Sequence, residues 1–587
     1  MKEYCIHLIC GIFVIMASMT TMANPSDKKT LSLRVIETSD VHGHFFPYDF
    51  IERKPLKGTL ARVNTYVERL RKEYGSRLLL IDNGDILQGQ PTCYYTNYVM
   101  PEAPNVAAEL VNYMRYDAET VGNHDIETGH AVYDKWIREV RCPMLGANIV
   151  RRDTGEPYVR PYSVHEVDGA KIVILGMITP AIPFWLNESL WSGLEFQEMV
   201  ACAKKWVGII REKEKPDLLL GLFHSGKSGG ITTDEYQENA TERVARLVPG
   251  FDIIFFGHDH TRHEDWVCNE EGNQVLCLDP SCFAQMVADA SIELTFEGGK
   301  LVRKDIKGQI RSVANEAVDE QLVSHFQPAI DSVKHYVDRQ IGYFDAPIEA
   351  RDCFFGSAPF TDFIHDIQLR ITGADISFNA PLIYDARIDE GPVTVADLFK
   401  LYRYENMIYT LEMTGEEIRR HLEMSYDLWV NTMTSPDDHI MRIEKGAFGS
   451  HVSQSDSYGF VNMTFNFDSA AGIDYEVDVT KPDGEKVRIL RMSDGTPFDV
   501  KKTYRVAMNS YRGNGGGELL TKGAGIPLDE LSRRIVFQSE RDQRHYIMLE
   551  IEKMGHVMPK ANNNWRFVPS EWTEPALKRD RKLIFND

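Results

Sequence analysis

The sequence predicts an α/β domain followed by a smaller α+β domain. In the first half, short apolar strands alternate with helical segments, and polar residues that can bind metal follow several of the strands. From about residue 343 strands and helices mix without that alternation. The chain has 587 residues, more than one hydrophobic core usually supports, which also indicates at least two domains.

The elements of the first half follow from their apolar patterns. Strands are predicted at 31–37, 78–81, 171–176, 218–222 and 253–256, and helices at 59–74 and 197–214. Open α/β sheets bind ligands at the carboxyl ends of their strands, so polar residues at those ends are candidate site residues. Domain limits of 30–315 for the α/β domain and 343–568 for the second domain are expected.

A helical connector is predicted at 316–342, where five apolar residues share one helical face: Leu322, Phe326, Ile330, Val333 and Val337. The second domain is predicted to contain strands near 375–378, 406–413, 474–480 and 503–508. Its predicted helices lie near 360–371, 394–401 and 414–425. Element ends are uncertain by about two to four residues.

The net charge of the chain limits the classes of molecule that it is expected to bind. With 65 basic and 87 acidic residues the net charge is −22. Such a field disfavours a nucleic-acid polymer and also repels small anions, unless a local positive charge such as a bound divalent cation reverses it.

The amino-terminal residues 1–23 are typical of a signal peptide, with Lys2, an apolar run too short for a membrane anchor, and small residues before Ala23. We therefore expect a secreted, periplasmic protein without a transmembrane segment. Seven scattered cysteines then remain, which is not a disulfide framework. Cys268 and Cys277 flank a predicted hairpin turn, and the sequence leaves open whether they are bonded or reduced.

Five motifs in the first half carry Asp, His and Asn but no thiolate. They are Asp40-Val-His42, Gly84-Asp85, Gly122-Asn-His-Asp125, His224-Ser-Gly226 and Gly257-His-Asp-His260. This ligand set suits hard-to-borderline divalent ions. Each motif alone has an ordinary explanation as a surface turn or a buried histidine. Five motifs that all carry Asp, His or Asn within one domain-sized segment together predict a metal centre.

The ordered motifs resemble those of the calcineurin-like metallophosphoesterases, and the second half resembles the C-terminal domain of 5′-nucleotidases. The match covers nearly the whole mature chain. Residues 36–42, 82–89 and 509–517 are most similar to the 2′,3′-cyclic-nucleotide 2′-phosphodiesterase/3′-nucleotidase branch. The resemblance implies a four-layer α/β sandwich as the catalytic domain, followed by a substrate-binding α+β domain.

The resemblance also implies a role for each motif residue. Asp40, His42 and His260 would hold one divalent ion, Asn123, His224 and His258 would hold a second, and Asp85 would bridge both. His124, oriented by Glu127, would act on the leaving oxygen of the substrate. Mn, Co, Zn, Fe and Mg all remain possible metals.

The second domain is implied to bind the nucleoside. Aromatic residues corresponding to Phe465 or Phe467 and to Tyr511 would sandwich the base, with Phe465 preferred to Phe467. The other residues implied at this site are Asn379, Arg512, Gly513, Asn514, Gly515, Gly516 and Gly517. Leu382 and Ile383 stand where the 5′-nucleotidase branch usually has arginines, which favours a cyclic or 3′ substrate; Arg387 or Arg512 could supply a charge instead.

The sequence thus predicts a secreted, monomeric, dinuclear-metal phosphohydrolase of nucleotide catabolism, in which metal-activated water attacks phosphorus. The preferred activity is 2′,3′-cyclic-nucleotide 2′-phosphodiesterase/3′-nucleotidase. The alternatives are a 5′-nucleotidase or UDP-sugar hydrolase and, from another class, a non-catalytic nucleotide-binding surface protein.

Overall fold

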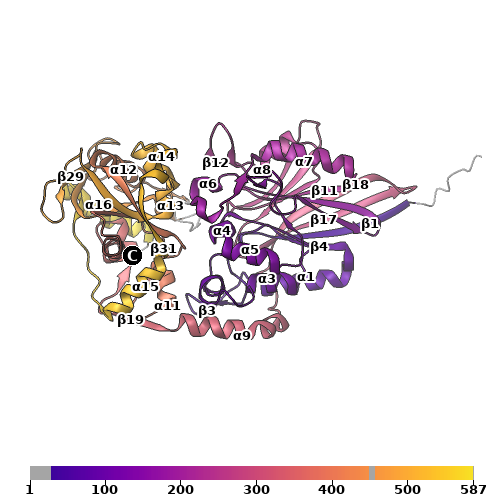
Figure 1. Cartoon of the computed structure of the whole chain (residues 1–587), viewed down its shortest axis with the longest axis horizontal. Helices are drawn as coiled ribbons and strands as arrows, with labels where there is room; N and C mark the ends of the chain where they lie inside the picture. Colours follow the sequence, from indigo (N-terminus) through magenta and orange to yellow (C-terminus); the bar gives the residue numbers. More distant parts are fainter. Residues whose placement is uncertain (1–27, 448–456, 586–587) are drawn as a thin grey trace, which may run out of the picture.

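The polypeptide forms two lobes, joined by a long helix that runs along the amino-terminal lobe (Figure 1). The structure is a computed structural model that describes residues 28–447 and 457–585. The expected signal peptide, residues 1–23, lies outside the described residues. Among the described residues no helix is both long and apolar enough to cross a membrane.

Two six-stranded sheets form the centre of the amino-terminal lobe. The first has the order β18-β17-β1-β4-β5-β6 and the second β15-β16-β14-β11-β9-β8. The first sheet contains β1 (Lys28–Thr38), β4 (Leu78–Asp82), β5 (Ala118–Thr120), β6 (Met144–Leu145), β17 (Met286–Glu297) and β18 (Lys300–Ser312). The second contains β8 (Tyr162–Val167), β9 (Ala170–Ile178), β11 (Leu218–His224), β14 (Ile253–Phe256), β15 (Arg262–Cys268) and β16 (Gln274–Pro280).

The amino-terminal lobe has four layers, which are helices, the first sheet, the second sheet and helices, because side chains on each strand alternate between the two faces of its sheet. On β4, Leu79 and Ile81 point into the core between the sheets, whereas Leu78 and Leu80 pack against helices. The helices on the first sheet are α1 (Leu60–Tyr74), α3 (Val106–Met114), α5 (His130–Glu139) and α9 (Glu320–Val337). Helices α7 (Met199–Lys213) and α8 (Thr241–Leu247) cover the second sheet. All five predicted strands and both predicted helices of this half are present, whereas β17 and β18 had not been predicted.

The connector is α9, and its five predicted apolar residues are all buried. They pack into the helical core of the amino-terminal lobe, so α9 belongs structurally to that lobe. The chain then enters the second lobe through β19 (Gln340–Phe344).

The second lobe is built on a five-stranded sheet with the order β27-β21-β30-β24-β31. Its strands are β21 (Ile376–Asn379), β24 (Met407–Thr414), β27 (Ser469–Ala471), β30 (Thr503–Asn509) and β31 (Ile535–Asp542). A three-stranded sheet adds β28 (Ile473–Asp478), β29 (Val487–Met492) and β33 (Trp565–Val568). The main helices are α10 (Pro359–Thr372), α11 (Val395–Leu401), α12 (Gly415–Trp429), α15 (Gln543–Met554) and α16 (Ser570–Phe585). Helix α16 packs into this lobe's core, past the expected limit at residue 568.

The two lobes contact each other beside the strand ends that carry the motifs. The hydroxyl of Tyr94 donates to Asp542 across the boundary at 2.9 Å, and the Asn514 side chain donates to the carbonyl of Trp185 at 3.0 Å. Trp185 belongs to the short helix α6 (Ile182–Trp185), which lies on the side of its lobe that faces the other lobe (Figure 1).

The predicted hairpin containing Cys268 and Cys277 exists as β15 and β16. Cys268 pairs with Gln274 and Cys277 pairs with Asp265, so the two thiols are not opposite each other. Both cysteines are free, Cys268 exposed and Cys277 buried.

Candidate active site

The seven predicted metal ligands all lie at the carboxyl ends of parallel strands. Asp40 follows β1, Asp85 follows β4, and His224 is the last residue of β11. His258 and His260 follow β14, and Asn123 begins α4 (Asn123–Glu127) after β5. The two sheets are joined here, because the backbone N–H of His258 donates to Asp40 at 3.0 Å.

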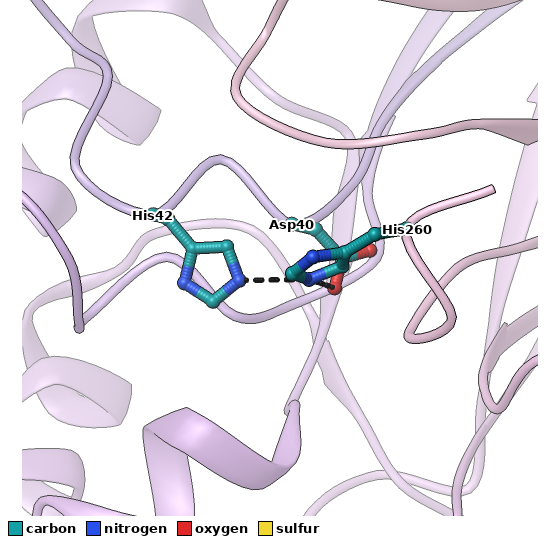
Figure 2. A group of neighbouring side chains, drawn as sticks. All are labelled: Asp40, His42 and His260. Carbon is teal, nitrogen blue, oxygen red and sulfur yellow. Dashed lines mark hydrogen bonds and ion pairs between the residues drawn. The ribbon is translucent and has the colours of Figure 1, made fainter. Parts of the chain in front are cut away.

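One group of ligand atoms comes from Asp40, His42 and His260 (Figure 2). The Nε2 atoms of the two histidines are 3.1 Å apart, and His260 Nε2 lies 3.3 Å from Asp40 Oδ1. The other carboxylate oxygen, Oδ2, is occupied by hydrogen bonds from Ser39 Oγ and the His258 backbone. Asp40 Oδ1 is buried and has no hydrogen-bond partner. This oxygen and the two imidazole nitrogens lie within 4.8 Å of one another, so a single ion could contact all three.

A second group surrounds the side-chain oxygen of Asn123. His224 Nε2 lies 2.9 Å and His258 Nδ1 lies 2.8 Å from Asn123 Oδ1. Asp85 Oδ2 is 3.2 Å from His224 Nε2 and 3.9 Å from His42 Nε2. One oxygen of Asp85 therefore lies within reach of both groups.

Neighbouring carbonyl groups fix which ring nitrogen faces the centre. His42 Nδ1 lies 3.1 Å from the carbonyl oxygen of Gln88, and His224 Nδ1 lies 2.7 Å from that of Asn83. A carbonyl oxygen only accepts, so these Nδ1 atoms carry hydrogen and the Nε2 lone pairs face the ligand groups.

The donor set fits divalent cations. Burial works against protonation of His224, but the charge of Asp85 prevails and raises its pKa to about 9. For the carboxyl of Asp85, burial acts in the other direction and would raise the pKa. The charges of His224 and His124 nevertheless hold the pKa of Asp85 well below its ordinary value. These groups are thus coupled through their charges, and their oxygen and nitrogen atoms are of the types that divalent ions bind.

Most of these predicted ligands have a strained backbone conformation that the surrounding structure enforces. Five of the seven have positive φ angles: Asp40 at 50°, His42 at 47°, Asp85 at 55°, His258 at 85° and His260 at 57°. L-residues rarely adopt this conformation, and clusters of it occur where the surrounding structure enforces a functional geometry. Nothing in the residue pattern indicated this feature.

Asp125 fixes the loop that carries Asp85. Its buried carboxylate accepts backbone N–H groups of Gly122, Asp85, Ile86 and Leu87 at 2.8–3.0 Å. Sequence reasoning placed Asp125 in a motif but gave it no role. Its spacing two residues after Asn123 was the available signal.

His124 and Glu127 form the predicted pair beside the ligand groups. His124 Nδ1 lies 2.6 Å from Glu127 Oε2, and its ring centroid is 5.4 Å from that of His42. Burial disfavours the charged imidazole, but the charge of Asp85 and the bond to Glu127 raise the pKa of His124 to about 9. A protonated imidazole at this position is suited to donate a proton to a leaving oxygen.

The predicted base-binding aromatic residues differ in accessibility. Phe465 and Tyr511 are half-buried, with ring centroids 6.0 Å apart. Phe467 is fully buried and stacks on Trp429 at 5.2 Å, so its ring is part of the core. Asn379 is buried at the end of β21, and neither polar atom of its side chain has a hydrogen-bond partner. An unpaired buried amide is rare and needs a partner such as a ligand or water.

Arg512, predicted to contact substrate, is instead buried in an ion pair with Asp468. Its guanidinium also donates to the carbonyl oxygens of Phe465 and Gly516. Arg512 thus ties together the two loops that carry the aromatic residues. Arg387, the other arginine considered, pairs with Glu349 and Asp389.

The glycines after Arg512 allow its loop to close. A Cβ atom on Gly516 would lie 2.5 Å from the Tyr511 ring, and Gly517 has a φ of 69° and would place a Cβ 2.0 Å from Asn466. Gly513 and Gly515 lie in the same turn. Asn514 contacts the other lobe through Trp185.

Comparison with known proteins agrees with this architecture. Residues 33–262 match the calcineurin-like phosphoesterase family, and residues 340–522 match the 5′-nucleotidase C-terminal domain. The chain is 26% identical to a 2′,3′-cyclic-nucleotide 2′-phosphodiesterase/3′-nucleotidase from Haemophilus influenzae, over 96% of this chain and 91% of the relative. It is 24% identical to a 5′-nucleotidase from Vibrio cholerae, over 78% and 88%. The structure of a putative 5′-nucleotidase from Staphylococcus aureus superimposes with a TM-score of 0.74 at 20% identity, over 92% of this chain and all of that one.

The two family matches lie in the two lobes, and the first includes all seven residues predicted to hold metal. The predicted fold class is therefore confirmed, and the residues present fit the divalent metal ions that the phosphoesterase domain implies. The chain belongs to the calcineurin-like phosphoesterases that carry a 5′-nucleotidase C-terminal domain, and is a metal-dependent phosphoric ester hydrolase.

Proposed function

We propose that this hydrolase opens 2′,3′-cyclic nucleotides and then removes phosphate from the resulting 3′-nucleotides, using two divalent ions. The position of Asp85 carries the proposal, because its Oδ2 lies 3.2 Å from His224 Nε2 and 3.9 Å from His42 Nε2. A shared carboxylate between two ligand groups is the arrangement that a two-metal centre requires. Relatives named for this activity, matched over nearly the full chain, support the choice of substrate.

Each group would hold one ion. Asp40, His42 and His260 would bind the first, Asn123, His224 and His258 would bind the second, and Asp85 would contact both. Two such ions supply Lewis-acid stabilisation of phosphoryl oxygens and lower the pKa of water, which makes a nucleophile available near neutral pH.

His124 would complete the reaction. Glu127 accepts the hydrogen on Nδ1 of His124, which leaves Nε2 to hold the proton that the departing sugar oxygen takes up. The same imidazole would serve both reactions, because ring opening of a cyclic phosphate and hydrolysis of a monoester each release a sugar hydroxyl, and Nε2 would take up a new proton from water between the two steps. One centre therefore suffices for two successive steps.

The second lobe would select the nucleoside. Phe465 and Tyr511 lie on two loops that Arg512 joins, with their rings nearly perpendicular at 88°, and Asn379 offers an unpaired amide. Aromatic faces recognise the flat base and an amide recognises polar edges. We assign Phe467 and Arg512 to the support of this site, since both are buried in structural contacts.

Steady-state kinetics on 2′,3′-cyclic AMP, 3′-AMP, 5′-AMP and UDP-glucose test the proposal. We expect the highest kcat/KM for the cyclic and 3′ substrates. A preference for 5′-AMP or UDP-glucose would favour the 5′-nucleotidase alternative, which the relative from Vibrio cholerae supports. Binding of nucleotides by the metal-loaded protein without turnover of any substrate would indicate the non-catalytic alternative.

We further propose that the protein is exported to the periplasm as a monomer after cleavage behind Ala23. The apolar run and small residues of the first 23 positions support cleavage, and the strong net negative charge of −22 favours solubility as single molecules. The mass of the mature protein, its elution volume and its presence in the periplasmic fraction test these points. Elemental analysis of the purified protein identifies the bound metals.

A further inference from the structure

His258 differs from His42 and His224 in the partner of its second ring nitrogen. His42 and His224 face backbone carbonyl groups, whereas His258 Nε2 lies 3.0 Å from the carboxylate oxygen Oε1 of Glu238. Both side chains are largely buried, with exposed fractions of 10% for His258 and 14% for Glu238. Glu238 lies outside every motif that the sequence analysis identified.

Glu238 is supplied by a hairpin made of β12 (Gly229–Thr232) and β13 (Gln237–Asn239). The hairpin lies near the side of its lobe that faces the second lobe (Figure 1). Its backbone at Glu238 is anchored, because the carbonyl oxygen accepts hydrogen bonds from Thr179 Oγ1 at 3.1 Å and Ser225 Oγ at 2.8 Å. Ser225 directly follows the ligand His224, so this anchor connects the hairpin to the strand end that carries the site.

The carboxylate of Glu238 is also held from its other side. Its second oxygen, Oε2, accepts the backbone N–H of Ile231 at 2.6 Å. Oε1 therefore faces His258, because the backbone carbonyl of Glu238 and its carboxylate oxygen Oε2 are both held by hydrogen bonds. A residue that only closed the hairpin would not need to place its other oxygen, Oε1, 3.0 Å from an imidazole nitrogen.

We propose that Glu238 is a positioning residue that fixes the tautomer and ring orientation of His258 for metal binding. A carboxylate accepts, so Nε2 of His258 carries the hydrogen and Nδ1 presents its lone pair toward Asn123 Oδ1, 2.8 Å away. The negative charge also makes the imidazole a stronger ligand. This inference rests on the proposed two-metal site and concerns the ion that Asn123, His224 and His258 would hold.

The test is titration of Co²⁺ into the metal-free, full-length protein, followed by calorimetry and by visible absorption. The wild type is expected to bind two ions. Glu238→Ala should weaken one of the two by about 10–100-fold and change the absorption of that ion, while the other binds as in the wild type. Glu238→Gln keeps an acceptor for Nε2 and should recover most of the affinity.

Glu235 provides a matched control, because it is exposed at the turn of the same hairpin. Glu235→Ala removes the same charge and should leave both affinities unchanged. Wild-type affinities in Glu238→Ala would overturn the proposal, and so would equal weakening of both ions, which would indicate general loss of structure. A wild type that binds fewer than two ions would instead overturn the two-metal function, a result visible without any variant.

Discussion

Replacing Asp468 by Asn is expected to loosen the loops that carry Phe465 and Tyr511 while the metal ligands stay intact. The Asp468 carboxylate accepts two hydrogen bonds from Arg512, at 2.8 and 3.1 Å, and lies 2.9 Å from His421 Nε2. Arg512 extends this network to the carbonyl oxygen of Phe465. The pair is therefore the buried connection beneath the proposed base-binding surface.

The pKa of Asp468 gives the size of the effect. Burial works against its ionisation, but Arg512 and His421 prevail and lower its pKa from 3.8 to about 2. This shift corresponds to roughly 2–3 kcal/mol of stability at neutral pH. The Asn variant also leaves Arg512 buried without its counter-charge, which brings the expected loss to about 3–5 kcal/mol.

The sign of the pH dependence follows from the lowered pKa. Asp468 is ionised in the folded protein down to about pH 2 and in the unfolded chain only above about 4. Its contribution is therefore complete above that higher value and is lost as the pH falls through about 2. Urea unfolding of wild type and Asp468→Asn should show a smaller difference at pH 3 than at pH 7.

Hydrogen–deuterium exchange of peptides covering 464–468 and 509–517 measures the local effect. A local loss of about 3 kcal/mol accelerates exchange there by roughly 100-fold. Asp529→Asn is the control, since its pair with Arg533 is exposed and contributes at most about 1 kcal/mol. Unchanged exchange in both loops would refute the reasoning. A raised KM with unchanged exchange would show that Arg512 contacts substrate directly.

Three further predictions concern the site itself. Asp85→Ala should reduce the bound metal below two ions per chain and lower kcat/KM by more than about 10³-fold, as checked by elemental analysis and kinetics; full metal content with full activity would contradict the shared role. His124→Ala should lower kcat by about 10²–10⁴-fold with unchanged metal content, and Glu127→Gln should do so less severely; loss of metal in either variant would instead indicate a ligand role. Tyr511→Ala should raise KM for nucleotides by roughly 5–100-fold and spare an aryl phosphate; equal loss on both substrates would argue against base stacking.

The local sequence predicted the strands, and placed the candidate ligands just after them, because both depend on short-range patterns. The run 218–222 is apolar at every position, as a strand buried on both faces requires, and it ends two residues before His224. The five apolar residues of α9 recur at helical spacing and all are buried. The long strands β17 and β18 were missed, since β17 is mostly buried yet carries polar residues such as Asp289 and Ser291 among its apolar ones, and β18 is largely exposed and charged.

The four strands and three helices predicted for the second lobe are present, but the burial of its side chains was harder to predict because it depends on partners far away in the chain. Phe465 and Phe467 are chemically identical and two residues apart, yet only Phe467 packs against Trp429. Arg512 has the charge expected of a phosphate ligand, but Asp468 neutralises it from 44 positions earlier. No local signal distinguishes a buried ion pair from a substrate contact.

By itself, the sequence determined which oxygen- and nitrogen-bearing side chains follow the strands and are therefore candidates for the site. The tertiary structure alone decided how those side chains are aimed. Positive φ angles at Asp40 and Asp85, and the acceptor that Glu238 offers to His258, arise from loops that other segments hold in place. A residue's type is encoded at its own position, whereas its orientation is set by the balance of packing and hydrogen bonds contributed by the whole fold.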